Sequence, residues 1–183
     1  NITTDNYMEI MELIYNFPGT FEGKTVTYTG FVYNDPTTPD AQFLLFTQAI
    51  QSIQSIHQKG GYLSEAFARN ILVDEQNQFS FIDFETDPRD VLSLHDCFVR
   101  DWLLFIFSTA YHFEFEQLND ASLILYKALL AEPQVYKDIA KVGKRLSWVL
   151  NFNVSKVGND GKRIQKCVLF LRDLKEHAEK AFA

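Results

Sequence analysis

Cysteine is scarce in this sequence, with Cys97 and Cys167 the two occurrences among 183 residues. The two stand far apart, in neither a CxxC pattern nor a Cys/His grouping, which argues against a structural zinc site. So few cysteines fit a reducing compartment. We therefore expect both to be small core residues and the chain to be cytoplasmic.

Long apolar runs are also missing. The longest, over residues 102–110, is too short to cross a bilayer, which takes about 20 apolar residues. The N-terminus has no basic segment followed by an apolar core, the pattern of a secretory signal. We expect no membrane span in this chain.

Positively charged residues are fewer than negatively charged ones, so the net charge is −7 at neutral pH. Such a chain repels a phosphate backbone, and no run of Lys and Arg alternates with aromatic residues, so nucleic acid is excluded as a partner. The local cluster of Lys141, Lys144 and Arg145 is predicted to be a solvated helix face.

Apolar residues are plentiful, at 46% of the chain with 17 Phe, so the chain can bury one good core or one core plus a small unit. Near the N-terminus, apolar residues at helical spacing behind Thr3 and Thr4 predict a helix over 5–15. Alternating β-branched and aromatic residues predict a strand over 24–33, and 42–46 is interpreted as a returning strand.

The pattern changes near residues 46 and 47, where we place a boundary between an N-terminal unit, 1–46, and a larger unit, 47–183. Helical spacing begins there and predicts a helix over 47–58, and two short apolar segments, 71–73 and 79–82, predict a hairpin. The remainder is predicted to be helical, with helices near 95–112, 115–131, 133–151 and 160–181. The expected fold class is α+β.

Three polar residues stand out at the ends of these short strands: Glu65, Asn70 and Asp83. A carboxylate, an amide and a second carboxylate are sufficient for phosphoryl transfer, which needs Mg²⁺ held against nucleotide phosphates and a group that orients the acceptor hydroxyl. The simpler interpretation is that they are turn and strand-end residues whose side chains bond to nearby backbone.

The spacing of Glu65, Asn70 and Asp83, with the segments 81–88 and 99–105, resembles the C-terminal lobe of bacterial kinase-like proteins related to lipopolysaccharide kinases. The resemblance covers residues 47–180. It implies a mainly helical protein-kinase-like C-lobe with a short β-hairpin, a phosphotransferase that uses Mg²⁺ and ATP, and an unknown hydroxyl acceptor.

The same resemblance implies roles for individual residues. Asn70 and Asp83 would bind metal and nucleotide, and Glu65 would take the position of the catalytic base. Asp101 would open the central helix and hydrogen-bond to the catalytic loop, with His57 as a second supporting residue. A helix-end histidine bonded to backbone carbonyls is the alternative for His57.

The sequence departs from the kinase pattern in three ways. Glu65 stands where the pattern has Asp, Leu63-Ser64 replaces the preceding dipeptide, and the first 46 residues contain no glycine-rich phosphate loop. Whether the chain is an active enzyme or a pseudokinase is therefore open.

A second resemblance covers the N-terminal unit. The segment 21–36 is similar to part of the β-rich, OB-like soluble region of a permease-associated bacterial membrane-protein family. It implies a different function, either a noncatalytic binding or scaffold module or a soluble accessory segment of a transport system, with a protein partner bound through residues 1–46. A natural fusion, an engineered chain and a coincidence of short motifs are all compatible with two partial resemblances.

Overall fold

The structure is a computed structural model that describes residues 39–74, 78–84, 87–152 and 158–181. The chain divides into two compact units, residues 1–32 and 33–183, and every described residue belongs to the second. The predicted helix over 5–15 and the predicted strand over 24–33 lie outside the described residues.

The described part is mostly helical and contains one small sheet, which confirms the broad α+β class. Its main elements are α2 (Pro39–Gln58), β1 (Ile71–Val73), β2 (Phe79–Phe81), α3 (Leu94–Thr109), α4 (Leu118–Leu129), α5 (Pro133–Leu146) and α6 (Gly158–Ala181). Short 3₁₀ turns connect several of them, including η2 (Ala68–Asn70), η3 (Pro88–Asp90), η4 (Ala110–His112) and η6 (Ser147–Asn151).

Helix α2 corrects the predicted strand over 42–46, because the helix begins at Pro39 and continues to Gln58 without interruption. Pro39 fits the first turn of a helix, where its missing N–H is not needed, and Asp40 adds a favourable negative charge there. Phe46, Ile50 and Ile53 are buried at helical spacing. The predicted boundary near residues 46 and 47 falls inside this helix, and the division into two units at that point stays a prediction.

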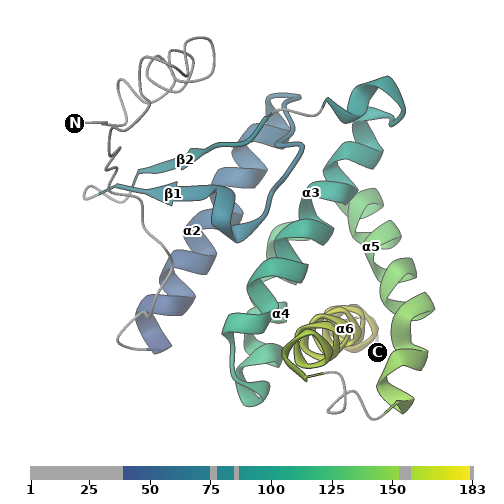
Figure 1. Cartoon of the computed structure of the whole chain (residues 1–183). Coiled ribbons are helices and arrows are strands. Elements are labelled where there is room, and N and C mark those ends of the chain that lie inside the picture. The colour runs from purple at the N-terminus through teal and green to yellow at the C-terminus, as the bar shows by residue number, and fades with distance from the viewer. Residues whose placement is uncertain (1–38, 75–77, 85–86, 153–157, 182–183) are drawn as a thin grey trace. The chain divides into compact units, whose positions relative to one another are not determined.

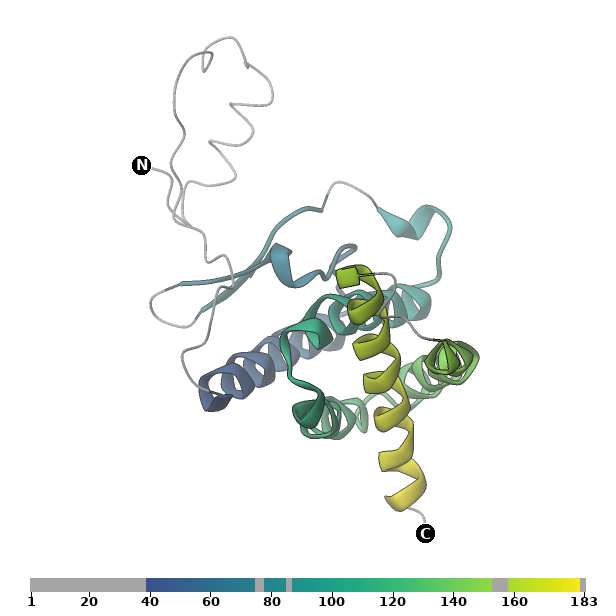
Figure 2. The same cartoon turned by 60° about the horizontal axis from the view of Figure 1, so that its bottom comes forward.

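The helices pack around one apolar core. In Figure 1, α3 lies between α2 and α5, and α5 forms the outer edge on the side away from the hairpin. Figure 2 shows α6 crossing in front of α4 and α5, the two helices with which it makes its main contacts. Phe46 of α2 joins these layers, since its ring stacks on Phe105 of α3 and meets Phe170 of α6 edge-on.

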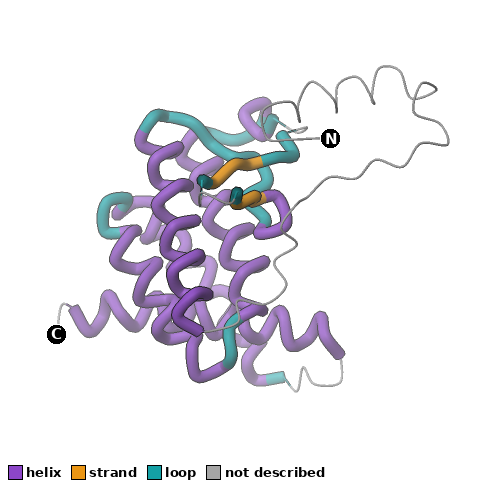
Figure 3. Tube along the Cα trace, turned by 90° about the vertical axis from the view of Figure 1, so that its left-hand side faces the viewer, coloured by secondary structure: helices purple, strands orange, loops and turns teal. Residues whose placement is uncertain are grey.

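The hairpin is antiparallel and lies at one end of the helices (Figure 3). Ile71 pairs with Phe81 and Val73 pairs with Phe79. This register confirms the predicted hairpin, and it brings the residue before β1, Asn70, close to the residues that follow β2.

The four helices expected after residue 94 are confirmed with small shifts of their ends. A capping box between Ser93 and Asp96 starts α3, and Pro133 occupies the first turn of α5, as predicted. Asn119 and Asp120 lie in the first turn of α4 and do not interrupt it.

The aromatic residues of α3 and the turn after it are divided between the core and the surface. Trp102, Phe105 and Phe113 are buried, but Phe107 and Phe115 are exposed. The two cysteines are free and buried, as expected of core residues.

Substitution of Phe46 tests the helical assignment of residues 42–46. Phe46 is 4% exposed and Leu44, two positions earlier, is 58% exposed. Phe46→Ala should lower the free energy of unfolding by about 3–5 kcal/mol, whereas Leu44→Ala should change it by less than about 0.5 kcal/mol. Urea denaturation measures both, and equal large losses would instead indicate a strand with both side chains on its buried face.

Candidate functional site

The loop between α2 and β1 is held in place by several hydrogen bonds. Gly60, with φ of 76°, ends α2 in a left-handed conformation that favours glycine. The Leu63 N–H donates to Asp101 Oδ2 at 2.7 Å, and Ala68 N–H donates to Ser108 Oγ at 2.9 Å, so the loop is bound to α3 at two points. The Tyr62 hydroxyl donates to Asp87, and this bond raises the pKa of Tyr62 to about 12.

Asn70 is the centre of the polar cluster above this loop. Its buried amide Nδ2 donates to the Glu65 carbonyl oxygen at 3.0 Å and to Asp83 Oδ2 at 3.2 Å. The Asn70 carbonyl oxygen in turn accepts from the Ile82 N–H at 3.0 Å. The structure thus brings Asn70 and Asp83 together, as their positions around the hairpin suggested.

Two residues of this region have an unfavourable backbone conformation. Ser64 has φ of 66° and Asp83 has φ of 72°, values that residues other than glycine seldom adopt. Strained backbone of this kind persists where the surrounding contacts enforce it, and it is concentrated at functional sites. Here it occurs on both sides of Asn70.

The Glu65 side chain has a different environment from its backbone. Its carboxylate lies 3.8 Å from the Arg69 guanidinium, and both groups are partly or largely exposed. Asn70 contacts the Glu65 carbonyl oxygen, so the contacts of the Glu65 carboxylate differ from those of Asp83.

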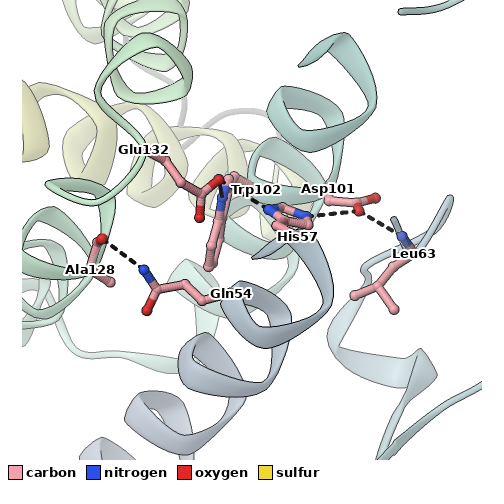
Figure 4. Close-up of polar contacts among 7 residues, drawn as sticks. All are labelled: Gln54, His57, Leu63, Asp101, Trp102, Ala128 and Glu132. Carbon is pink, nitrogen blue, oxygen red and sulfur yellow. Dashed lines mark hydrogen bonds and ion pairs between the residues drawn. The ribbon is translucent and has the colours of Figure 1, made fainter. Parts of the chain in front are cut away.

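A second polar cluster connects the loop to the helices, and its His57 and Asp101 side chains are buried (Figure 4). His57 Nε2 lies 3.2 Å from Asp101 Oδ2, and His57 Nδ1 lies 3.2 Å from Glu132 Oε2. The imidazole stacks on Phe98, with ring centroids 4.1 Å apart. The cluster connects the end of α2, the middle of α3 and the turn before α5.

The protonated form of His57 fits this cluster best. A neutral imidazole donates through one nitrogen only, so its other nitrogen would face a carboxylate oxygen without a proton between them. Burial of the ring opposes protonation, but the hydrogen bonds to Asp101 and Glu132 outweigh it and raise the pKa of His57 above 6.5.

The contacts of Asp101 and His57 differ from those expected of them from the sequence. Asp101 accepts from the loop N–H, but it lies in the middle of α3 rather than at its start. The alternative for His57, bonding to backbone carbonyls at a helix end, is wrong, because its partners are two carboxylates. Glu132 was missed entirely, since no sequence spacing connects it with a residue 75 positions earlier.

An apolar pocket lies beside the hairpin. It is bounded by α2, β1, β2 and the end of α3, and its lining includes Phe46, Ile71, Val73, Phe79, Phe105 and Phe113. Because Asn70 directly precedes β1, the pocket and the Asn70–Asp83 cluster are neighbours along the same short strand.

The described residues contain no group of three or more His, Cys, Asp or Glu side chains that could hold a metal ion. No helix among them is long and apolar enough to cross a membrane.

Comparison with known proteins finds a family match in the N-terminal part of the chain. Residues 1–53 match the family described as the DUF1980 C-terminal domain. The match supports the resemblance to a permease-associated family and extends it within α2, from residue 46 to residue 53.

One curated relative agrees with this family match. It is a Streptococcus mutans protein named as a two-component membrane permease complex subunit, 56% identical over 43 residues. The aligned region is 24% of this chain and 16% of the relative, so the chain spans about a sixth of that protein. No solved structure matches the chain.

These two matches correct the first sequence-based assignment. Kinase, transferase, ATP-binding protein and pseudokinase are wrong as descriptions of the chain, because the family match is to the DUF1980 C-terminal domain and the relative is named as a permease complex subunit. The individual roles given to Glu65, Asn70, Asp83, Asp101 and His57, and the expected Mg²⁺ and ATP, are not tested by the matches.

The buried histidine predicts a pH dependence of stability. Because the pKa of His57 is raised in the folded protein, its contribution is fully present below the unfolded-state pKa of about 6.5 and is lost as pH rises through the folded-state pKa. The free energy of unfolding of the wild type, relative to His57→Gln, should therefore be largest near pH 6 and fall at alkaline pH. Urea denaturation from pH 5.5 to 8.5 measures the difference.

His95→Gln is the matched control, since His95 pairs with Asp138 at 2.8 Å but both side chains are partly exposed. Solvent screens such a pair, so this substitution should have a much smaller effect on stability. A difference between wild type and His57→Gln that stays constant or grows with pH would contradict the buried ion pair.

Proposed function

We propose that this chain is an accessory segment of a membrane transport complex and that residues 1–53 carry its recognition of a permease partner. The observation that supports this proposal is the match of those residues to the DUF1980 C-terminal domain, together with the relative named as a permease complex subunit. The chain would act by binding a protein partner rather than by catalysis.

Helix α2 is the physical link in this proposal. Residues 39–53 belong both to the matched segment and to the core of the helical unit, where Phe46, Ile50 and Ile53 are buried. The buried amide of Gln42 also donates to the His112 carbonyl oxygen at 2.8 Å. A partner that binds the matched segment would therefore act directly on a helix of the packed core.

Co-purification tests the proposal. A tagged full-length chain should retain a membrane protein with several spans from detergent-solubilised host membranes, identified by mass spectrometry. Removal of residues 1–38 should abolish this capture, because it removes most of the matched segment while leaving α2 complete.

Two controls separate recognition from misfolding. Circular dichroism of the shortened chain should retain the helical signal of α2 to α6, and residues 1–38 fused to an unrelated carrier should compete for the partner. Capture of the same membrane protein by the shortened chain, or no specific capture by the full chain, would contradict the proposal.

A second candidate function uses Asn70 and Asp83, and the observation that favours it is the strained backbone at Ser64 and Asp83 on both sides of Asn70. We propose that Asp83, with the Asn70 amide, binds Mg²⁺ at this site. Oxygen atoms of carboxylates and amides are donors that suit Mg²⁺, which is commonly bound through one or two carboxylates and several waters. A site with a single carboxylate would bind weakly and would use water for its remaining ligands.

Isothermal titration with Mg²⁺ tests this site. The wild type should bind at millimolar concentration, and Asp83→Asn should weaken binding by about tenfold or more because it removes the anionic ligand. Asp90→Asn is the matched control, as it removes one exposed carboxylate nearby in the sequence. Equal binding by wild type and Asp83→Asn would exclude this assignment.

A further inference from the structure

Positive charge is unevenly distributed along this acidic chain. Residues 137–166 hold eight of its 17 Lys and Arg but two of its 24 Asp and Glu. This stretch is therefore cationic within a chain of net charge −7. It includes most of α5, all of η6 and the start of α6.

Five exposed side chains of this stretch lie at the spacing of one helix face. Lys141, Lys144, Arg145, Trp148 and Phe152 are all exposed. Lys144 and Arg145 are adjacent, and each lies three or four positions from both Lys141 and Trp148, which in turn lies four positions before Phe152, the spacing of neighbours on a helix surface. We call these five residues the α5–η6 face. The opposite side of α5 is buried through Val135, Ile139 and Gly143, and a Cβ at Gly143 would lie 3.0 Å from Leu171 Cβ of α6.

Two large aromatic side chains are the unusual part of this face. Trp148 is 57% exposed and Phe152 is 62% exposed, and their rings meet edge-on with centroids 5.5 Å apart. In Figure 1, α5 is the outermost helix on its side of the described unit. An exposed apolar cluster bordered by polar side chains is typical of an interaction site.

The cations of this face are available to a partner. Lys141 pairs with Asp138 on its own helix, whereas Lys144 and Arg145 have no ion pair among the described residues. Both stand in the last turn of α5, where a positive charge interacts favourably with the helix dipole. The dipole explains two cations at a helix end, but it does not explain exposed Trp and Phe side chains in the next turn.

Aromatic rings beside Lys and Arg are the combination that binds the interface of an anionic bilayer. Trp and Phe insert at the level of the headgroups and acyl chains, while Lys and Arg contact lipid phosphates and acidic headgroups. We propose that the α5–η6 face binds the surface of a membrane that contains anionic phospholipid. This inference deepens the proposed function, on which it rests for the presence of a membrane, but its residues lie outside the matched segment 1–53.

Tryptophan fluorescence can report this contact without an added label. The chain has two tryptophans, and Trp102 is fully buried, so the exposed Trp148 is the residue whose environment lipid binding would change. The full chain should sediment with phosphatidylcholine vesicles that contain phosphatidylserine, and its tryptophan emission should shift to shorter wavelength. Binding should be much weaker to phosphatidylcholine alone and should decrease with salt.

Two double variants test the two parts of the face. Lys144→Glu/Arg145→Glu should weaken vesicle binding by about tenfold or more, because each basic residue near an anionic surface contributes severalfold. Trp148→Ala/Phe152→Ala should also weaken binding and should remove the emission shift. Circular dichroism checks that each variant is folded.

Matched controls use residues outside this face. Arg89→Glu/Lys127→Glu changes the net charge by the same amount, and Leu44→Ala/Leu130→Ala removes two exposed apolar side chains. Both control variants should bind vesicles about as well as the wild type.

Three results would overturn the inference: no binding to the anionic vesicles, equal weakening by the control variants, or binding without a shift in Trp148 emission. The last result would indicate simple charge attraction, as for an acidic protein segment. Because vesicles contain no permease, these outcomes are independent of the co-purification experiment. Loss of vesicle binding with retained partner capture would leave the proposed function intact.

Discussion

The buried contact of His57 with Asp101 and Glu132 is the constraint on which the described structure depends most. Asp101 Oδ2 also accepts the Leu63 N–H, so one carboxylate fixes the helix-end histidine and the following loop together. That loop leads directly to Asn70 and the hairpin. A charged group buried in this way is costly unless it is paired, so loss of one partner would disturb the end of α2, the loop and the start of α5 at once.

Helix α2 gives this constraint a functional meaning. Its first part belongs to the segment that matches a permease-associated family, and its last turn carries His57. Gln54 strengthens the same helix by donating to the Ala128 carbonyl oxygen of α4 at 2.8 Å (Figure 4). The two sequence resemblances therefore meet inside one continuous helix, and a linker does not separate them.

The sequence predicted the hairpin and the later helices because their apolar residues repeat with a clear period and their ends carry strong signals, such as Pro133. It failed over 42–46, where five residues were too few to distinguish a strand from the first turns of a helix. Packing of Phe46 against Phe105 and Phe170 decides that segment, and such contacts come from residues far away in the sequence. The Glu132 partner of His57 was missed for the same reason.

The Asn70–Asp83 pair shows that a correctly predicted local geometry does not by itself make a chain a kinase. The hairpin register alone brings these two residues together, since one precedes β1 and the other follows β2. Any protein that places Asn and Asp at these strand ends gains the same hydrogen bond, whatever its activity. The spacing therefore reports how the chain turns, whereas the family match over residues 1–53 carries information about partners that no spacing of three residues contains.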